Sequence, residues 1–420
     1  MAVVRLYGMA LSRKLFLGCT TIGLGVPLLT LGGGLLWTVR TFGGDAQRLE
    51  EERAAARREG VPLTGEDLRS KVPVPDAENA AIPIREIKKL WPESKRRQEE
   101  HLLDAGRKAT ATETQRTEAR KILVRLAPVL ALAYEAANRP ACDFEYDFNL
   151  GVKLQFPELA DMRALARLLC TEAELADSPE KAFAAIQATA RLGKHAGAAP
   201  TLICGLVNVA IGTMAHRQFV LNLARFGGPA IPYARATLDS WGESFPLSHY
   251  LGGESVFYHV SAQQFIDGKL TMKDLTDSYS TEEESGRQSK GSDLPPVIGP
   301  MVMGAWATRG IMYWRGAYKV LRENEANPSR AHAEFVAYSQ KWEESWKSLR
   351  KPQNILLSIL SPVYTQAGDK LYLQPATEQR LRETTLALLE AGGKDVPLPP
   401  DPYAPNNAPL KLRREGKGFT

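Results

Sequence analysis

The sequence predicts a mostly α-helical protein with little β structure, in which one N-terminal transmembrane helix is followed by an irregular multi-helix bundle or helical-hairpin array. Three observations lead to this fold class. Residues 15–39 are apolar and uncharged, apolar residues recur at helical spacing through residues 76–394, and alternating strand-like patterns are scarce. With 420 residues, of which 44% are hydrophobic, the chain can bury a sizeable core.

Residues 15–39 (LFLGCTTIGLGVPLLTLGGGLLWTV) predict the transmembrane helix because they carry no charge. As a helix this stretch would be roughly 37 Å long, enough for a hydrocarbon core of about 30 Å. Residues 1–14 form a short basic tail, which resists translocation, and Trp37 suits the opposite membrane interface. We therefore expect a single-pass protein that contacts the lipid bilayer of the bacterial inner (cytoplasmic) membrane, with its C-terminal domain in the periplasm.

Three other kinds of N-terminal segment fit residues 15–39 less well. A cleaved signal peptide has a shorter apolar core and small residues at its cleavage site. A lipoprotein signal would need an apolar core ahead of Cys19, and a pilin-type segment would need an acidic residue near the start of the apolar run. Charge alone leaves the orientation open, since five arginines follow the stretch between residues 40 and 58.

Residues 40–75 predict a juxtamembrane helix and a linker. The part from Asp45 to Glu59 is rich in Ala, Glu and Arg, which are strong helix formers, and its few apolar residues predict a solvated helix. Thr64 and Asp67 then have the spacing of a capping box. The prolines of the KVPVP run at the end of this region predict an extended linker.

Residues 76–394 predict one helical domain. Ser178 and Pro179 are typical of a helix start, and residues 200–225 are apolar nearly all round, which predicts a central, buried helix. Apolar residues at helical spacing predict further helices at residues 301–324, 329–349 and 376–391.

Two stretches interrupt or complicate this domain. Residues 276–296 are polar and poor in apolar residues, which predicts a loop. Residues 297–314 are apolar enough to suggest a second membrane span. Arg309 near the end of that stretch would be costly in lipid and Pro300 shortens it, so we expect a buried helix instead.

The segment from Asp143 to Phe148 is the clearest strand candidate, because acidic and aromatic residues alternate in it. In a strand, Asp143, Glu145 and Asp147 would point one way. Three convergent carboxylates are candidate ligands for calcium, and two of them are candidates for the catalytic acid and base of a glycosidic hydrolase. We favour a third interpretation, in which the aromatic face packs on helices and the acidic face meets water, because no glycine-bearing calcium loop surrounds the segment.

No other motif indicates a metal, a cofactor or a catalytic centre. The six histidines form no HExxH pair, the four cysteines show no CxxC spacing, and the chain has no GxSxG elbow. Cys170 and Cys204 would form a disulfide only if their helices were antiparallel neighbours, and lone cysteines on apolar faces are usually buried thiols. The net charge of +5 is small and spread along the chain, so we expect no nucleic-acid partner.

Residues 395–420 predict an extended basic tail, because four prolines lie between residues 397 and 402 and four basic residues between residues 411 and 417. The tail and the early part of the chain also carry a resemblance. Four runs together resemble a pattern in uncharacterised membrane-anchored helical proteins of planctomycete bacteria: GVPLTGEDL at 60–68, PDAENAA at 75–81, LPPDPY at 398–403 and PLKLRREGKGF at 409–419.

That resemblance implies an N-terminal anchor, a helical body and a bacterial envelope setting, and it implies no activity. The family's ending is similar to the C-terminal strand region of secretion pseudopilins and normally continues into a second strand, a continuation that is missing after Thr420.

These observations favour a non-enzymatic, membrane-anchored envelope protein, which is a helical scaffold or protein-interaction domain with an unidentified protein partner. One alternative is an envelope hydrolase that uses the acidic cluster at residues 143–147. Another is an accessory protein of a secretion or pilus system. The hydrolase hypothesis requires the carboxylates to lie in a concave pocket, whereas the scaffold hypothesis requires an exposed apolar patch or groove on the helical body.

Overall fold

The computed structural model describes most of the chain beyond residue 38. The predicted transmembrane helix at residues 15–39, apart from Val39, and the predicted polar loop at residues 276–296 lie outside the described residues. The structure describes residues 39–40, 42–69, 72–108, 110–242, 245–271, 299–325, 327–347, 369–404, 408–411, 414–415 and 418–419.

The regular structure in these residues is almost all helical, which confirms the prediction of a mostly α-helical, multi-helix bundle with little β structure. The exceptions to α-helix are the 3-10 helices η1 (Phe148–Lys153) and η2 (Gly228–Ala230), the π-helix η4 (Asp369–Leu373), and the antiparallel strands β1 (Arg414–Glu415) and β2 (Gly418–Phe419). The α-helices in chain order are α2 (Leu49–Arg58), α3 (Gly65–Leu68), α4 (Ala81–Leu90), α5 (Glu93–Arg107), α6 (Glu113–Arg125), α7 (Ala127–Asn138), α8 (Glu158–Leu175), α9 (Pro179–Ala196), α10 (Leu202–Phe226), α11 (Ile231–Trp241), α12 (Leu247–Ile266), α14 (Gly299–Glu323), α15 (Pro328–Lys347) and α17 (Gln374–Glu390).

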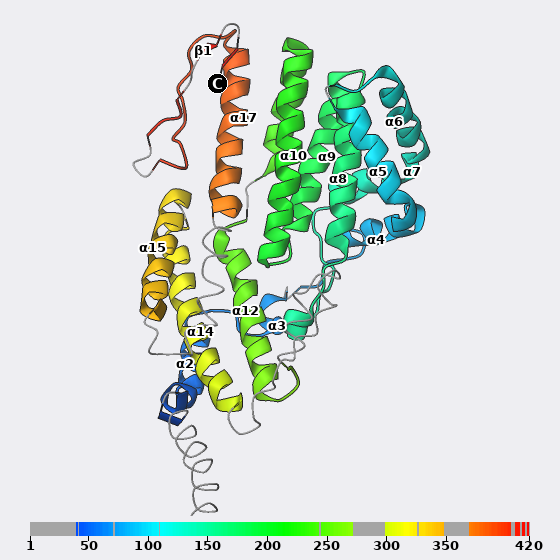
Figure 1. The fold of residues 1–420 in the computed structure, drawn as a ribbon. Helices are drawn as coiled ribbons and strands as arrows, with labels where there is room; N and C mark the ends of the chain where they lie inside the picture. The colour runs from blue at the N-terminus through cyan, green and yellow to red at the C-terminus, as the bar shows by residue number, and fades with distance from the viewer. Residues whose placement is uncertain are drawn as a thin grey trace, which may run out of the picture.

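Helices α8, α9 and α10 form the centre of the larger part of the bundle, with α4 to α7 on one side and α17 on the other (Figure 1). The helices approach closely because many of the buried side chains between them are alanines. The prediction for residues 200–225 is partly right. Helix α10 packs against α8, α9, α12 and α17, but Ile203, Val220 and Leu221 are exposed on it, so α10 is not buried on every side.

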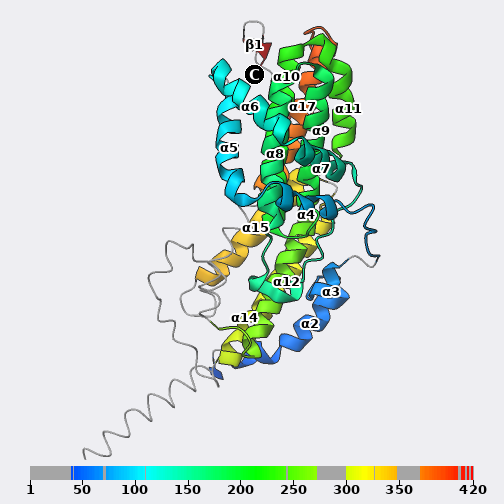
Figure 2. The same ribbon diagram turned by 90° about the vertical axis from the view of Figure 1, so that its right-hand side faces the viewer.

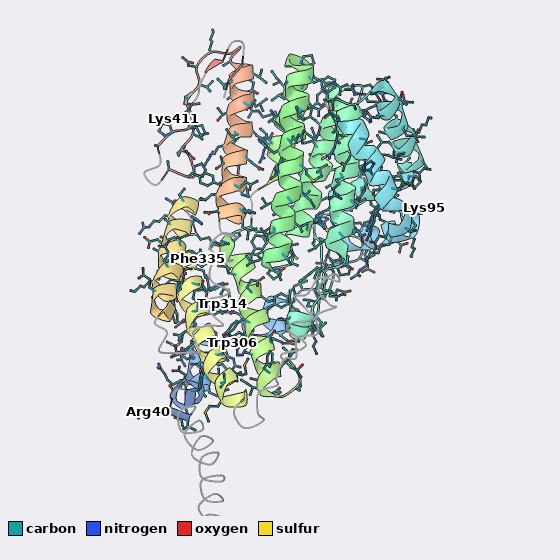
Figure 3. The ribbon with its side chains drawn as sticks, viewed as in Figure 1. Arg40, Lys95, Trp306, Trp314, Phe335 and Lys411 are labelled. Atoms are coloured by element: carbon teal, nitrogen blue, oxygen red, sulfur yellow. The ribbon has the colours of Figure 1, made fainter. Side chains whose placement is uncertain are left out.

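Helices α12, α14 and α15 form the second part of the bundle, below α10 and α17 in Figure 1. Its core is aromatic: Trp314 from α14 and Phe335 from α15, both labelled in Figure 3, are buried together with Tyr258 and Tyr313. Helix α14 contains the described part of the stretch considered for a second membrane span, and it is the buried helix that Arg309 and Pro300 favoured. Among the described residues, no helix combines the length and the apolar character that a bilayer crossing requires.

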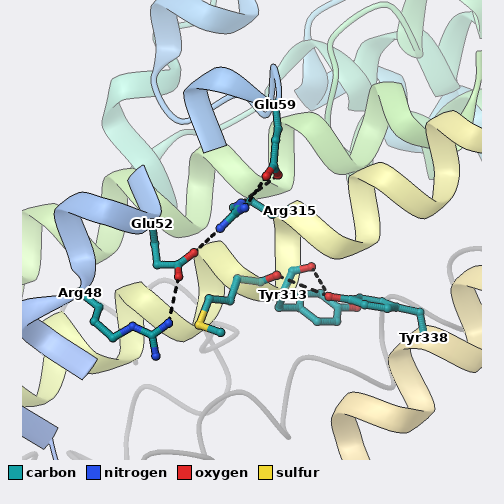
Figure 4. Close-up of polar contacts among 7 residues, drawn as sticks. Arg48, Glu52, Glu59, Tyr313, Arg315 and Tyr338 are labelled. Carbon is teal, nitrogen blue, oxygen red and sulfur yellow. Dashed lines mark hydrogen bonds and ion pairs between the residues drawn. The ribbon is translucent and has the colours of Figure 1, made fainter. Parts of the chain in front are cut away.

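Helix α2 does not stand free in water, so the prediction of a solvated helix is wrong for one of its faces. Leu49 and Ala56 are buried against the second part of the bundle, beside α14 (Figure 2). Arg315 of α14 pairs with both Glu52 and Glu59 of this segment (Figure 4). The low apolar content was misleading because alanine needs little area to pack, and the charged residues find partners on α14.

An ion pair and a hydrogen bond extend this attachment towards the N-terminal end of α2. The guanidinium of Arg309 lies 2.6 Å from a carboxylate oxygen of Asp45, and the hydroxyl of Thr308 donates to the carbonyl of Asp45 at 2.7 Å. We call the contacts of Asp45, Glu52 and Glu59 with Arg309 and Arg315 the α2 clamp. The clamp joins the region that follows the predicted anchor to the body of the protein.

Several local predictions can be compared with the structure. Asp67 accepts the backbone N–H of Thr64 at 2.9 Å, which confirms the capping box, and Ser178 caps α9 as expected. Helices α14, α15 and α17 agree with their predicted bounds to within two residues at each end. Cys170 and Cys204 are buried free thiols, so no disulfide joins them. In the tail, β1 and β2 form a small hairpin where only an extended chain was expected.

Candidate functional site

A cleft with a volume of about 500 Å³ lies where α9 ends and α10 begins. Two stretches without regular secondary structure form its walls, one at residues 72–74 after α3 and one at residues 142–147 before η1. The second wall is the alternating segment that the sequence analysis singled out. The cleft is lined by Leu68, Arg69, Pro73, Val74, Cys142, Asp143, Phe144, Glu145, Tyr146, Phe148, Leu159, His195, Ala196, Ala198, Ala199, Pro200 and Cys204.

The wall at residues 142–147 is not a β-strand, so that prediction is wrong. Glu145 has a φ of +55°, which turns the chain out of the extended conformation. No neighbouring strand is present in the described residues to supply a hydrogen-bond ladder. Instead, the Asn79 side chain accepts the N–H of Asp143 and donates to its carbonyl, both at 2.8 Å, and Arg85 donates to the carbonyl of Phe144 at 2.7 Å.

Although the segment is not a strand, buried and exposed side chains still alternate along it. Phe144 and Phe148 are buried, whereas Glu145 and Asp147 are exposed. The Tyr146 ring packs edge to face on Phe156, with ring centroids 4.8 Å apart, and lines the cleft. The segment therefore packs its aromatic side chains on the helices, as the favoured interpretation of the sequence expected.

The three carboxylates do not converge. Asp143 accepts the N–H of Glu145 at 2.7 Å, the Glu145 carboxylate lies 3.8 Å from a guanidinium nitrogen of Arg85, and Asp147 lies 3.6 Å from Arg69. Asp143 and Glu145 line the cleft, but Asp147 does not. Within the described ranges no three His, Cys, Asp or Glu side chains are grouped so that they could hold a metal ion. The geometry thus supports neither a calcium site nor a facing acid–base pair.

Three further titratable groups line the cleft: His195, Cys142 and Cys204. Burial lowers the pKa of His195 to about 4, so its imidazole is neutral at neutral pH. Burial also raises the pKa of Cys142 far above its usual value and that of Cys204 to about 12. Both thiols are therefore protonated, and the cleft does not hold the thiolate and imidazolium that a cysteine nucleophile needs.

Polar contacts fix the side chains and helix ends that lie beneath the cleft. The hydroxyl of Tyr146 donates to Glu158 at 2.9 Å. Glu254 of α12 accepts the N–H of Leu202 at 2.9 Å, at the first turn of α10, and burial raises the pKa of Glu254 to about 7. These contacts fix the ends of the helices under the cleft. Sequence reasoning missed His195 and Glu254, because each sits in an ordinary helical pattern with no motif around it.

Backbone groups are also available in the wall of the cleft. Among the described residues, no hydrogen-bond partner meets the backbone N–H or C=O of Cys142 or Tyr146.

No family model, curated protein or solved structure matches the chain. What the cleft can do therefore follows from its own chemistry. It has an apolar and aromatic floor, a rim with charges of both signs, and a wall in which the backbone groups of Cys142 and Tyr146 have no partner among the described residues.

Proposed function

We propose that the protein is a membrane-anchored bacterial envelope protein whose helical domain binds an extended segment of a partner protein in the cleft. The observation that carries the proposal is the wall at residues 142–147, which lines the cleft and leaves backbone groups of Cys142 and Tyr146 without partners in the described chain. An extended peptide can hydrogen-bond to these backbone groups and place apolar side chains against the apolar residues of the cleft.

The side chains around the wall support this kind of ligand. Tyr146 is only partly buried and offers part of its ring to apolar side chains, while Arg69 and Glu145 at the rim offer charges of both signs. A partly apolar cleft with a few polar groups is typical of a recognition site. A binding scaffold of this kind needs no catalytic group.

The proposed anchor is the uncharged stretch at residues 15–39, inserted in the inner membrane with the body in the periplasm. The α2 clamp supports a fixed link between anchor and body, because α2 begins close after that stretch and is attached along α14. Figure 3 shows Arg40 at the end of the body opposite α17, so the membrane would lie at that end.

The proposal is tested by photo-crosslinking in membranes. A benzophenone amino acid at Val74, in the cleft, is expected to capture a polypeptide, and the adduct should weaken when Arg69→Glu is added. The matched control is the same probe at Val124, an apolar residue that is 76% exposed on α6. Equal adducts at Val74 and Val124, or recovery of the full chain in the supernatant after membranes are pelleted, would contradict the proposal.

A further inference from the structure

We propose that a second, smaller cavity binds a small carboxylate anion through the guanidinium of Arg382. This cavity lies among α10, the end of α11, the start of α12, η4 and α17 and shares no lining residue with the large cleft, and the inference does not depend on the proposed function. Its volume is about 40 Å³, and its lining residues are Asn208, Val209, Gly212, Trp241, Gly242, Phe245, Tyr250, Leu371, Pro375, Glu378, Gln379 and Arg382.

Arg382 is held in this cavity by packing. Arg382 is only 4% exposed, and its guanidinium carbon lies 3.8 Å from the ring centroid of Trp241. Burial lowers the pKa of Arg382 to about 10, so the group remains charged at neutral pH. Trp241 covers one flat face of the guanidinium, which leaves the edge of the planar group as the surface that can meet a ligand.

That edge has no partner in the described chain. The Nε of Arg382 is buried without a hydrogen-bond acceptor, and no described carboxylate forms an ion pair with the guanidinium. Glu378, one turn earlier on α17, also lines the cavity, but its Oε1 accepts from the hydroxyl of Thr213 at 2.8 Å and the amide of Gln374 at 2.9 Å. A buried guanidinium edge without an acceptor is unfavourable, and the described residues supply none for Nε, so this geometry favours a bound anion as the acceptor.

The shape and charge of the cavity favour a carboxylate as that acceptor. Nε–H and the adjacent Nη–H point the same way and match the two oxygens of a carboxylate. A second cation is near, because a Cβ placed on Gly242, which lines the cavity, would lie 2.7 Å from the Nζ of Lys194. A volume of about 40 Å³ is enough for about three waters or one formate or acetate ion, but not for a bulky ligand.

The test uses the full chain in detergent, with acetate as the probe and chloride at the same ionic strength as the reference. Acetate should raise the unfolding temperature saturably in the wild type and in Arg380→Gln, a control on the same helix whose side chain is 45% exposed. Arg382→Gln should lose this response, and Arg382→Lys should raise the half-saturating concentration roughly tenfold, because lysine lacks the paired donors. Benzoate and inorganic phosphate should not reproduce the response.

A second measurement covers the case in which Arg382→Gln does not fold. Acetate bound beside Arg382 should change the fluorescence of Trp241, and the change should disappear in Trp241→Phe while the other tryptophans remain. The proposal is overturned if acetate does no more than chloride in the wild type, if Arg382→Gln keeps the response, or if the fluorescence change persists in Trp241→Phe. A stronger response to phosphate than to acetate would also overturn it.

Discussion

The two parts of the bundle achieve close helix packing in different ways. Around α8, α9 and α10 the approach depends on small side chains, since alanines are frequent in the buried interface. Between α12, α14 and α15 it depends on rings placed over glycines: a Cβ on Gly310 would meet the Tyr258 ring at 1.8 Å, and one on Gly316 would meet the Tyr338 hydroxyl at 2.0 Å. The second arrangement is less tolerant of substitution, because a single methyl group added to the glycine occupies the space that the ring needs.

The largest expected effect comes from filling one of these spaces. Gly310→Ala should destabilise the protein by about 3 kcal/mol, because the hydroxyl of Tyr258 donates to the carbonyl of Trp306 at 2.7 Å and the ring cannot swing away. Gly212→Ala is the matched control on α10, where a Cβ meets nothing within 4 Å. There the better helix propensity of alanine should stabilise the protein by about 0.5–1 kcal/mol. Chemical denaturation measures both, and equal stabilities would refute the contrast between the two parts.

Each part of the bundle contains a buried histidine whose protonation should make the stability of the protein depend on pH. Burial lowers the pKa of His195, on α9, and of His259, on α12, to about 4. The unfolded chain takes up these protons below its pKa of about 6.5, but the folded chain does not, so stability should fall as the pH drops from about 6.5 to 4. At pH 5 each histidine should cost about 2 kcal/mol.

The comparison is made with His195→Gln and His259→Gln, whose stability relative to the wild type should rise between pH 7 and pH 5. Using differences from the wild type removes the opposite contribution of Glu254, whose raised pKa of about 7 causes stability to be lost as the pH increases above 4.5. If only one of the two variants resists acid, the two parts unfold separately rather than together.

The smallest expected effect concerns the α2 clamp. Arg315→Gln removes the pairs with Glu52 and Glu59 and should cost about 1 kcal/mol at low salt, with less difference at high salt. Hydrogen exchange should increase in α2 and remain unchanged in α9. Arg120→Gln, which breaks an exposed pair with Glu113, should have almost no effect. Protection of α2 that survives in Arg315→Gln would show that its apolar contacts alone hold it.

The helical bundle could be predicted from the sequence because apolar spacing determines which face of each helix is buried. The cleft could be predicted only in part. Alternation drew attention to residues 143–148, but the hydrogen bonds that replace a strand come from Asn79, far away in the sequence. No pattern in the sequence predicted the small cavity. Arg380 and Arg382 are two residues apart on one helix, and only the position of Trp241 on α11 decides that Arg382 is the buried one.

The way α2 is fastened to the body has a mechanical consequence. A domain on a flexible linker adopts many positions and orientations relative to the membrane. A domain attached through a helix that is packed against its body keeps one distance from the membrane and one orientation. If residues 15–39 are held in a bilayer, the cleft opens at one constant distance from the lipid surface. Partners would then be selected by how far their recognition segment extends from the membrane as well as by its sequence.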